Sequence, residues 1–238
     1  MKQSINTVDD LYRMLDKYVD GVVWDEFYTE RKYKAPFVVQ NKLPDEFLVE
    51  ILDNCNFKNA LDLGCGEGRN AVYMAKRVET VIAVDLSDKA VETAKKFAAE
   101  NNVNIDFKCA NIFNIQFDKK FDFIYDSGTF HHLAPHRRLS YLGLLNEYLK
   151  NGGYFGLCCF AEGENCADEV DDYEFYKRRR TGVAFSQERL CEFFGNMFDV
   201  IEIRRYKNGI DGTVQGLEFM RVCLFRKKAV KLTEISRQ

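Results

Sequence analysis

The chain has 238 residues, of which 46% are hydrophobic, and its 34 Lys and Arg against 37 Asp and Glu give a formal net charge of −3. At about 150 residues per domain, this length favours one large α/β domain over residues 1–238. The near balance of charge gives no general attraction to nucleic acid or anionic membranes, and the composition excludes disordered, fibrous and histone-like proteins.

The cysteines and the apolar runs indicate a cellular compartment. No segment approaches the roughly 18 consecutive apolar residues of a membrane helix, and the N-terminal sequence has no apolar leader. The 8 cysteines lie mostly inside apolar segments without CxxC spacing. We expect them to be reduced and buried, in a cytoplasmic protein with no membrane partner. Since no Cys/His spacing matches a metal site, we expect no metal.

The N-terminal part, before residue 59, shows about three helical segments. We assign residues 1–43 to an N-terminal cap and residues 44–238 to the core of the domain. This part also contains a cluster of aromatic residues. Such clusters more often form part of a core than a pocket, although in a cap over a binding site they could line the pocket. The aromatic residues of this part are Trp24, Phe27, Tyr28, Tyr33 and Phe37.

From about residue 59, short apolar runs alternate with amphipathic helical stretches, which is typical of βαβ units and a parallel sheet. Helices are predicted from the turn after the first strand to about residue 77, from Ser87 to residue 101, and over 136–150, where Asn151-Gly152-Gly153 ends the helix. The predicted strands are 60–63, 81–85, 103–109, 121–126 and 154–160.

The pattern changes after residue 160. Residues 161–184 are charged and irregular, and their basic run at 177–180 indicates either a solvated face or a contact with an acidic substrate or nucleic acid. A short helix begins at Ser186. Strands at 200–206 and 218–225, joined by an Asn208-Gly209 turn, predict an antiparallel pair. The fold class is therefore α/β, a Rossmann-like, doubly wound, mostly parallel seven-stranded sheet that ends in an antiparallel hairpin.

The most informative segment is LDLGCGEGRN, residues 61–70, where a strand runs into three alternate glycines and then a helix. Glycine allows a tight turn and the close approach of a ligand, and the helix offers free N–H groups. A dinucleotide site would have GxGxxG, but Arg69 occupies the position of its third glycine. The spacing therefore favours a ligand without phosphates.

A second segment agrees with this interpretation. Asp85 ends the strand VIAVD, where nucleotide-binding sheets place an acid for ribose hydroxyls. A glycine-rich turn alone could be purely structural, but both features at the ends of successive strands favour a binding site.

The ordered motifs resemble those of class I S-adenosylmethionine (SAM)-dependent methyltransferases. LDLGCGEGRN is similar to their first motif, VDLSDKAV to the second, CANIF to the segment flanking the adenine, and FDFIYDSGTFHHL to the fourth motif. LKNGGYF is similar to the turn before the fifth strand, so the resemblance extends over about residues 45–225. More narrowly, IYDSGTFHHLAPHRRLSY resembles the thiopurine and tellurite-resistance methyltransferase branch.

The resemblance implies SAM as the cofactor and assigns residues to it. Asp85 would bind the ribose hydroxyls, Leu86 would pack on the adenine, and Asn111 would accept a hydrogen bond from the adenine amino group where the family often has an acid. Asp126 and Ser127 would face the methionine and the substrate. The methionine end and the adenine segment would involve the remaining positions, Asp62, Gly64, Cys65, Gly66, Gly68, Asn70 and Ile112.

Asp126, His131 and His132 are the candidate catalytic residues, because a hydroxyl or amine acceptor needs a general base. The alternative for the histidines is that one packs in the core and the other caps the next segment. Cys65 is interpreted as a small residue of the glycine motif. A thiolate or other soft acceptor would need no base.

The methyl acceptor is expected to be a small molecule, since the Asn/Asp-Pro-Pro-Tyr segment of nucleobase amino-methyltransferases is replaced by Asp126-Ser127-Gly128-Thr129. RNA or protein methylation, and a SAM-binding module without turnover, are the alternatives; nucleic acid is not an expected partner. We also predict that residues 20–40 and the segment 161–184, with Tyr173, Phe175 and Tyr176, form a lid over the methyl group. The sequence does not indicate the oligomeric state.

Overall fold

A computed structural model describes residues 4–19, 23–30, 42–163, 167–178, 182–207 and 212–229. The expectations for Tyr33, Phe37, Cys166, Arg179, Arg180 and the Asn208-Gly209 turn lie outside the described residues. The cysteines within these ranges are all free thiols. No helix in the same ranges has the length and apolar character needed to cross a bilayer.

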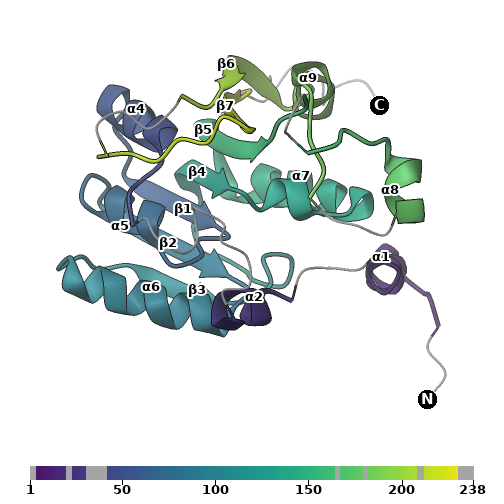
Figure 1. Cartoon of the computed structure of the whole chain (residues 1–238), viewed down its shortest axis with the longest axis horizontal. Helices are drawn as coiled ribbons and strands as arrows, with labels where there is room; N and C mark the ends of the chain where they lie inside the picture. Colours follow the sequence, from purple (N-terminus) through teal and green to yellow (C-terminus); the bar gives the residue numbers. More distant parts are fainter. Residues whose placement is uncertain are drawn as a thin grey trace, which may run out of the picture.

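The core of the structure is one seven-stranded sheet with the order β3-β2-β1-β4-β5-β7-β6 (Figure 1). The five strands β3, β2, β1, β4 and β5 run parallel to one another, and β7 is antiparallel to both β5 and β6. This confirms the predicted fold class. The strands are β1 (Asn59–Leu63), β2 (Thr80–Asp85), β3 (Asp106–Cys109), β4 (Phe121–Ser127), β5 (Leu149–Phe160), β6 (Phe198–Arg205) and β7 (Met220–Lys227).

Helices cover both faces of the sheet. One buried cluster joins α4 and α5 to one face, and a second joins α7 and α9 to the other (Figure 1). Alternate strand residues face opposite sides, so Leu61 and Ala60 belong to different clusters. The helices are α1 (Val8–Asp16), α2 (Trp24–Glu30), α4 (Glu46–Asn54), α5 (Arg69–Ala75), α6 (Asp88–Glu100), the short 3₁₀ helix η1 (Phe130–His132), α7 (Pro135–Tyr148), α8 (Asp172–Arg178) and α9 (Gln187–Phe194).

The predicted boundaries hold best where a capping residue defines them. Ser87 and Ser186 accept hydrogen bonds from the backbone N–H groups of Ala90 and Arg189, and so begin α6 and α9 as expected. The prediction for the end of α7 was wrong. The helix ends at Tyr148, and Asn151-Gly152-Gly153 lies inside β5, where Gly152 has a φ of 75°.

The N-terminal segment consists of two helices in different places. The Asp16 carboxylate at the end of α1 accepts hydrogen bonds from Arg137 and lies 2.8 Å from Nε2 of His136, so α1 is fixed beside α7. α2 packs beside α6, at the end of the sheet where β2 and β3 finish (Figure 1). Of these two helices, α2 is therefore the one in position to cover this edge. The boundary of the cap at residue 43 stays a prediction.

Gly68 is needed for packing between two helices. It begins α5 with a φ of 86°, and a Cβ there would lie 2.8 Å from Cβ of Ala94 in α6. We expect Gly68→Ala to lower the free energy of unfolding by about 2–5 kcal/mol, since it adds left-handed strain to overpacking.

Gly143→Ala is the matched control. A Cβ added at Gly143, in α7, would meet nothing within 4 Å. This substitution should raise stability by about 0.5–1 kcal/mol, because alanine is the better helix former. Urea unfolding of both variants measures the two effects, and equal effects would contradict the packing role of Gly68.

Candidate functional site

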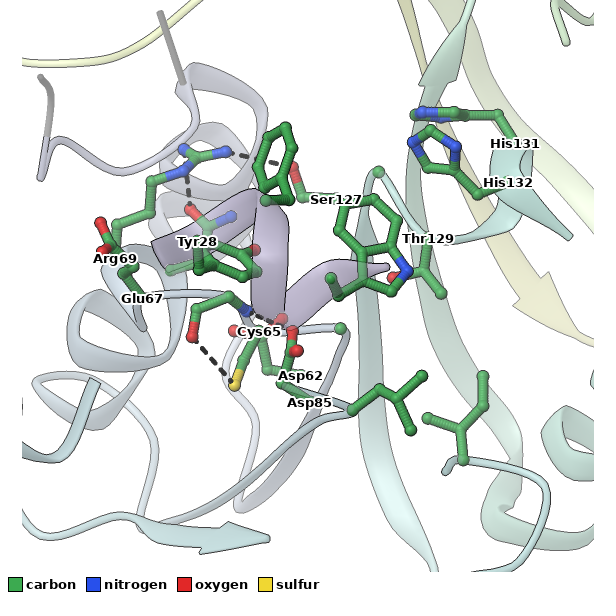
Figure 2. Close-up of a pocket in the computed structure, with 18 of the residues that line it drawn as sticks. Tyr28, Asp62, Cys65, Glu67, Arg69, Asp85, Ser127, Thr129, His131 and His132 are labelled. Carbon is green, nitrogen blue, oxygen red and sulfur yellow. Dashed lines mark hydrogen bonds between the residues drawn. The ribbon is translucent and has the colours of Figure 1, made fainter. Parts of the chain in front are cut away.

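A cavity of about 650 Å³ opens at the carboxyl ends of β1, β2 and β4. Open α/β sheets bind ligands at this edge, and the volume lies within the usual range for small-molecule sites. Its walls come from the loops after these strands, from α2, and from the segments around the end of β5 and the start of β7 (Figure 2).

The glycine loop forms the floor of the cavity. The backbone N–H groups of Gly64 and Cys65 donate to the Val84 carbonyl, which fixes the loop against β2. A Cβ on Gly64 would lie 1.8 Å from Oγ1 of Thr129, and one on Gly66 would lie 2.7 Å from the Tyr28 hydroxyl. These two glycines and Cys65 line the cavity. A larger residue at either glycine would have to displace Thr129 or Tyr28, and the positive φ angles of 71° and 52° also favour glycine.

Gly68 does not line the cavity, so its predicted contact with the cofactor is not supported. Asn70 does line the cavity, but both polar atoms of its side chain are hydrogen-bonded within the protein, to Asp45. Its amide oxygen accepts from the Asp45 backbone N–H at 3.0 Å, and its amide nitrogen donates to the Asp45 carboxylate at 2.9 Å.

Asp85 lies at the end of β2 with both carboxylate oxygens in use. They accept hydrogen bonds from the backbone N–H groups of Gly66, at 2.8 Å, and Ser87, at 2.9 Å. Burial raises the pKa of Asp85, against the effect of these hydrogen bonds. Each oxygen keeps a lone pair for a hydroxyl of a ligand. Leu86 beside it lines the cavity and is 55% exposed, as expected for a residue that an adenine ring would cover.

The Asp62 carboxyl is buried beneath the glycine loop, and its Oδ2 atom has no hydrogen-bond partner among the described residues. Burial raises its pKa to about 8. An unpaired buried oxygen is unfavourable unless a ligand pairs with it. Asp62 is therefore a position that a ligand amino group would stabilise.

Asn111 and Ile112 line the cavity after β3, on the side of Leu86 where the sequence places the adenine. The Asn111 amide oxygen already accepts from the Phe113 backbone N–H at 2.9 Å. One lone pair remains for the predicted hydrogen bond to an adenine amino group.

The structure does not support Asp126 as a general base or as a cofactor ligand. Its carboxylate accepts hydrogen bonds from Tyr141, at 2.6 Å, and from the backbone N–H groups of Thr129 and Phe130. Its side chain is fully buried and does not line the cavity. Burial raises its pKa to about 7, against these hydrogen bonds. Asp126 therefore shapes the loop that carries Ser127, and Ser127 does line the cavity.

His131 and His132 both line the cavity, on the opposite side from Arg69 and Glu67 (Figure 2). The Nδ1 atoms of both rings are buried without a hydrogen-bond partner among the described residues. Burial lowers the pKa of His132 to about 4 and that of His131 well below its ordinary value. Both imidazoles are therefore neutral at neutral pH.

α2 lies across the cavity and lines it with Trp24, Phe27 and Tyr28. It belongs to the segment 20–40 for which a lid is predicted, and residues 23–30 of that segment lie among those described. The Ser87 hydroxyl donates to Asp25 at 2.5 Å, which anchors the helix to the start of α6. Tyr28 reaches the glycine loop, and Trp24 packs edge-on against His132 with ring centroids 5.0 Å apart. α2 therefore extends from one end of the cavity to the other.

The structure does not support the prediction that the segment 161–184 forms part of the lid, because none of the described residues of this segment lines the cavity. Its aromatic side chains are used elsewhere. Tyr173 is 85% exposed, Phe175 is buried in the core, and the Tyr176 hydroxyl lies 2.8 Å from Nδ1 of His136. The segment approaches the cavity at Gly182, where a Cβ would lie 3.6 Å from the His132 ring.

A buried ion pair at the other end of the cavity was not predicted from sequence patterns. The Arg69 guanidinium is paired with Asp45 and donates to the Ser127 hydroxyl at 3.2 Å (Figure 2). Burial acts to raise the pKa of Asp45, but Arg69 and hydrogen bonds outweigh it, and the pKa falls below its ordinary value. The signal for Arg69 was its place after the third glycine, which indicated only that the motif was not GxGxxG.

Comparisons with known proteins identify methyltransferases as the relatives of this chain. A family model described as a methyltransferase domain matches residues 60–153. A 2-heptyl-1-hydroxyquinolin-4(1H)-one methyltransferase of Mycobacteroides abscessus is 38% identical over 85 residues, 35% of this chain and 37% of that protein. The chain therefore spans well under half the length of that relative.

A shorter relative is matched over more of its length. An uncharacterized methyltransferase of Schizosaccharomyces pombe is 30% identical over 107 residues, 44% of this chain and 73% of that protein. The structure of Burkholderia thailandensis 1,6-didemethyltoxoflavin-N1-methyltransferase, with bound 1,6-didemethyltoxoflavin and S-adenosylhomocysteine, has a TM-score of 0.64 at 17% identity and covers 96% of this chain and 94% of its own. The chain belongs to the class I SAM-dependent methyltransferases.

The residues of the cavity fit the cofactor of this family, SAM. Gly64 and Gly66 line the cavity without a side chain of their own, and the unpaired Asp62 oxygen suits the amino group of the methionine part. Asp85 suits the ribose hydroxyls. Arg69, which follows the glycines, is paired with Asp45 and is not free to bind a pyrophosphate.

The raised pKa of Asp62 predicts a pH dependence of stability. The folded state keeps this proton up to about pH 8, whereas the ordinary pKa is 3.8, so the stability of the ligand-free protein falls as pH rises between these values. Asn has no such proton. We expect the loss of unfolding free energy from pH 6 to pH 8 to be about 2 kcal/mol smaller in Asp62→Asn than in the wild type.

Urea titrations at the two pH values measure this difference. Asp122→Asn is the matched control, because hydrogen bonds from Lys150 and backbone N–H groups, against desolvation, lower the pKa of Asp122 and so confine its titration to acid pH. From pH 6 to pH 8, Asp122→Asn should lose as much unfolding free energy as the wild type. An Asp62→Asn protein with the wild-type pH dependence would contradict the assignment.

Proposed function

We propose that the protein transfers the methyl group of SAM to a small-molecule acceptor bound in the same cavity. The observation that carries this proposal is the arrangement of the two ends of the cavity. Asp85 and the glycine loop form one end, an aromatic recess with two neutral histidines forms the other, and α2 covers both.

The cofactor would be held by residues of three loops. Asp85 would accept hydrogen bonds from both ribose hydroxyls, Leu86 and Ile112 would enclose the adenine, and Asn111 would accept from its amino group. The glycine loop and Asp62 would bind the methionine part. Ser127, which accepts a hydrogen bond from Arg69, would lie beside the methionine part, across the cavity from the histidines.

SAM supplies an electrophilic methyl group on a sulfonium, which a nucleophile displaces in line. Most of the rate then comes from orientation of the nucleophile and exclusion of water. In this chain, α2 provides the cover, with Trp24, Phe27 and Tyr28 on its inner side. Their ring faces also suit a cationic sulfur, because cations are attracted to π-systems.

The histidines support hydrogen bonding to the acceptor better than strong base catalysis. A neutral imidazole can accept a proton, but a group whose pKa is about 4 is a weak base for an ordinary hydroxyl. Asp126 is not available, since its oxygens are bonded to Tyr141 and to the loop. The accepting atom is therefore proposed to be an uncharged centre that is already nucleophilic, such as a heteroaromatic nitrogen.

RNA or protein methylation and SAM binding without turnover are the alternatives. The covered cavity favours a small acceptor over a polymer, because α2 lies across the edge that a polymer would have to approach. The quinolone and toxoflavin methyltransferases that resemble this chain are named for small-molecule substrates, which supports the same choice. A cytoplasmic location stays a prediction.

The cofactor assignment predicts the effect of removing the Asp85 carboxylate. Asp85→Ala should weaken SAM binding by about 2 kcal/mol or more, roughly 30-fold, because two charge-assisted hydrogen bonds are lost. Isothermal titration calorimetry with SAM and S-adenosylhomocysteine measures this effect. Asp85→Asn keeps the shape and one carbonyl oxygen, so its affinity should be intermediate.

Asp88→Ala is the matched control, since Asp88 lies in the first turn of α6 and does not line the cavity. Its affinity for SAM should equal that of the wild type. Unchanged affinity in a folded Asp85→Ala protein would refute the cofactor site. Release of S-adenosylhomocysteine on addition of small acceptors distinguishes an enzyme from a binding module, which would bind SAM and release none.

A further inference from the structure

The end of the cavity away from Arg69 is a recess of aromatic side chains. Trp24 packs edge-on against His132, and the His131 ring stacks on Phe160 with centroids 3.7 Å apart. Met220, which pairs with Phe160 in the sheet, also lines the cavity. We call the four rings the aromatic recess: Trp24, His131, His132 and Phe160.

The four rings of the aromatic recess carry no charge. In Figure 2 Arg69 and Glu67 lie across the cavity from the histidines. None of the charged side chains that line the cavity, among the described residues, belongs to the recess: they are Lys42, Asp45, Asp62, Glu67, Arg69 and Asp85. Arg69 is compensated by Asp45. The histidines are neutral because burial lowers their pKa. A charged ligand group in the recess would therefore be buried without a counter-charge, which is strongly unfavourable.

The aromatic recess does contain unpaired hydrogen-bonding atoms. Nδ1 of His131 and Nδ1 of His132 are both buried without a partner in the described part of the chain. A neutral imidazole has one N–H donor and one acceptor nitrogen. Leaving such atoms unpaired is costly, so the recess favours a ligand that brings one hydroxyl or N–H group to them.

The shape of the recess selects flat groups. Its walls are the edge-on Trp24 and the stacked pair of His131 and Phe160. Aromatic rings pack on such walls by offset stacking and edge-to-face contacts, which gain more than the burial of area alone. A saturated ring of the same size cannot make these contacts.

We propose that the aromatic recess is the acceptor subsite, and that it takes an uncharged planar aromatic compound with one hydroxyl or N–H group that hydrogen-bonds to His132. The inference rests on the proposed methyl transfer, because it places the acceptor in the same cavity as the cofactor. Trp24, from α2, then sets specificity from the lid, and His132 sets it from the loop after β4.

A series of probes on one ring system tests each part of this proposal. The protein is first saturated with S-adenosylhomocysteine, and binding is then measured by calorimetry. 2-Naphthol has the ring and the hydroxyl, naphthalene lacks the hydroxyl, 2-naphthoate carries a charge, and decahydro-2-naphthol is not planar. We expect 2-naphthol to bind most tightly, by about five- to tenfold over naphthalene for one hydrogen bond, and by more over 2-naphthoate.

The variant His132→Phe keeps a ring in the recess and removes its nitrogens. It should weaken the binding of 2-naphthol about five- to tenfold and leave the binding of naphthalene within about twofold of the wild type. His136→Gln is the matched control, because His136 lies outside the cavity between Asp16 and Tyr176 and should change neither affinity.

Two further variants separate ring contacts from the hydrogen bond. Trp24→Ala removes a wall of the recess and should weaken both 2-naphthol and naphthalene. If His132→Phe does not fold, His132→Asn is used instead, because it keeps a hydrogen-bonding group without the ring. His132→Asn should weaken the binding of both probes, because the ring is lost, and should keep the preference for 2-naphthol, because a hydrogen-bonding group remains. Unchanged binding of naphthalene in this variant would contradict the ring contact.

The outcomes separate the two levels of the proposal. If S-adenosylhomocysteine does not bind, the proposed function fails. If it binds, but 2-naphthoate or decahydro-2-naphthol binds as well as 2-naphthol, or none of the probes binds, the acceptor subsite is wrong and the cofactor site stands. Equal losses of 2-naphthol and naphthalene in His132→Phe would overturn the role of His132.

Discussion

The buried ion pair between Asp45 and Arg69 joins the segments that enclose the cavity. Asp45 also accepts hydrogen bonds from Asn70 and from the Tyr125 hydroxyl, at 2.9 Å each, so the start of α4 is bonded to α5 and β4. Arg69 donates to the Leu43 carbonyl and to the loop after β4. A buried pair of this kind adds little net stability, but the loss of one partner leaves an unpaired charge and is strongly destabilising. These bonds therefore fix geometry: they hold α5, the segment before α4 and the end of β4 in one arrangement.

The two ends of the cavity differ in polarity. At the cofactor end, polar groups are partly used by the protein and partly open, as with Asp85, whose oxygens bind the glycine loop and keep lone pairs for a ligand. At the acceptor end, burial removes charge from the histidines and leaves aromatic walls. α2 connects the ends, since Asp25 is bonded to Ser87 and Trp24 packs on His132. A polar end for the reagent and a dry end for its target are what methyl transfer requires.

Sequence patterns predicted the features that depend on local chemistry. The parallel strands, the Ser87 cap, the glycine loop and Asp85 follow from periodicity, capping and backbone conformation, which neighbouring residues determine. Contacts between distant residues were not predictable in this way. Asp126 was expected to face the ligand because it lies near the end of a strand. Instead, its buried carboxylate accepts a hydrogen bond from the hydroxyl of Tyr141 in α7. The pairing of Asp45 with Arg69 and the position of the 161–184 segment beside α7 are likewise decided by packing. The aromatic cluster before residue 40 could be interpreted either as core or as pocket until α2 was placed.

The most direct test of methyl transfer to a small molecule uses SAM with a deuterated methyl group. The protein and labelled SAM are incubated with cell extract separated into low-molecular-weight, RNA and protein fractions, and each fraction is analysed by mass spectrometry. We predict that the label appears in one or more low-molecular-weight compounds, and that Asp85→Ala protein transfers much less. Label confined to RNA or protein, or the same labelling with Asp85→Ala, would contradict this function.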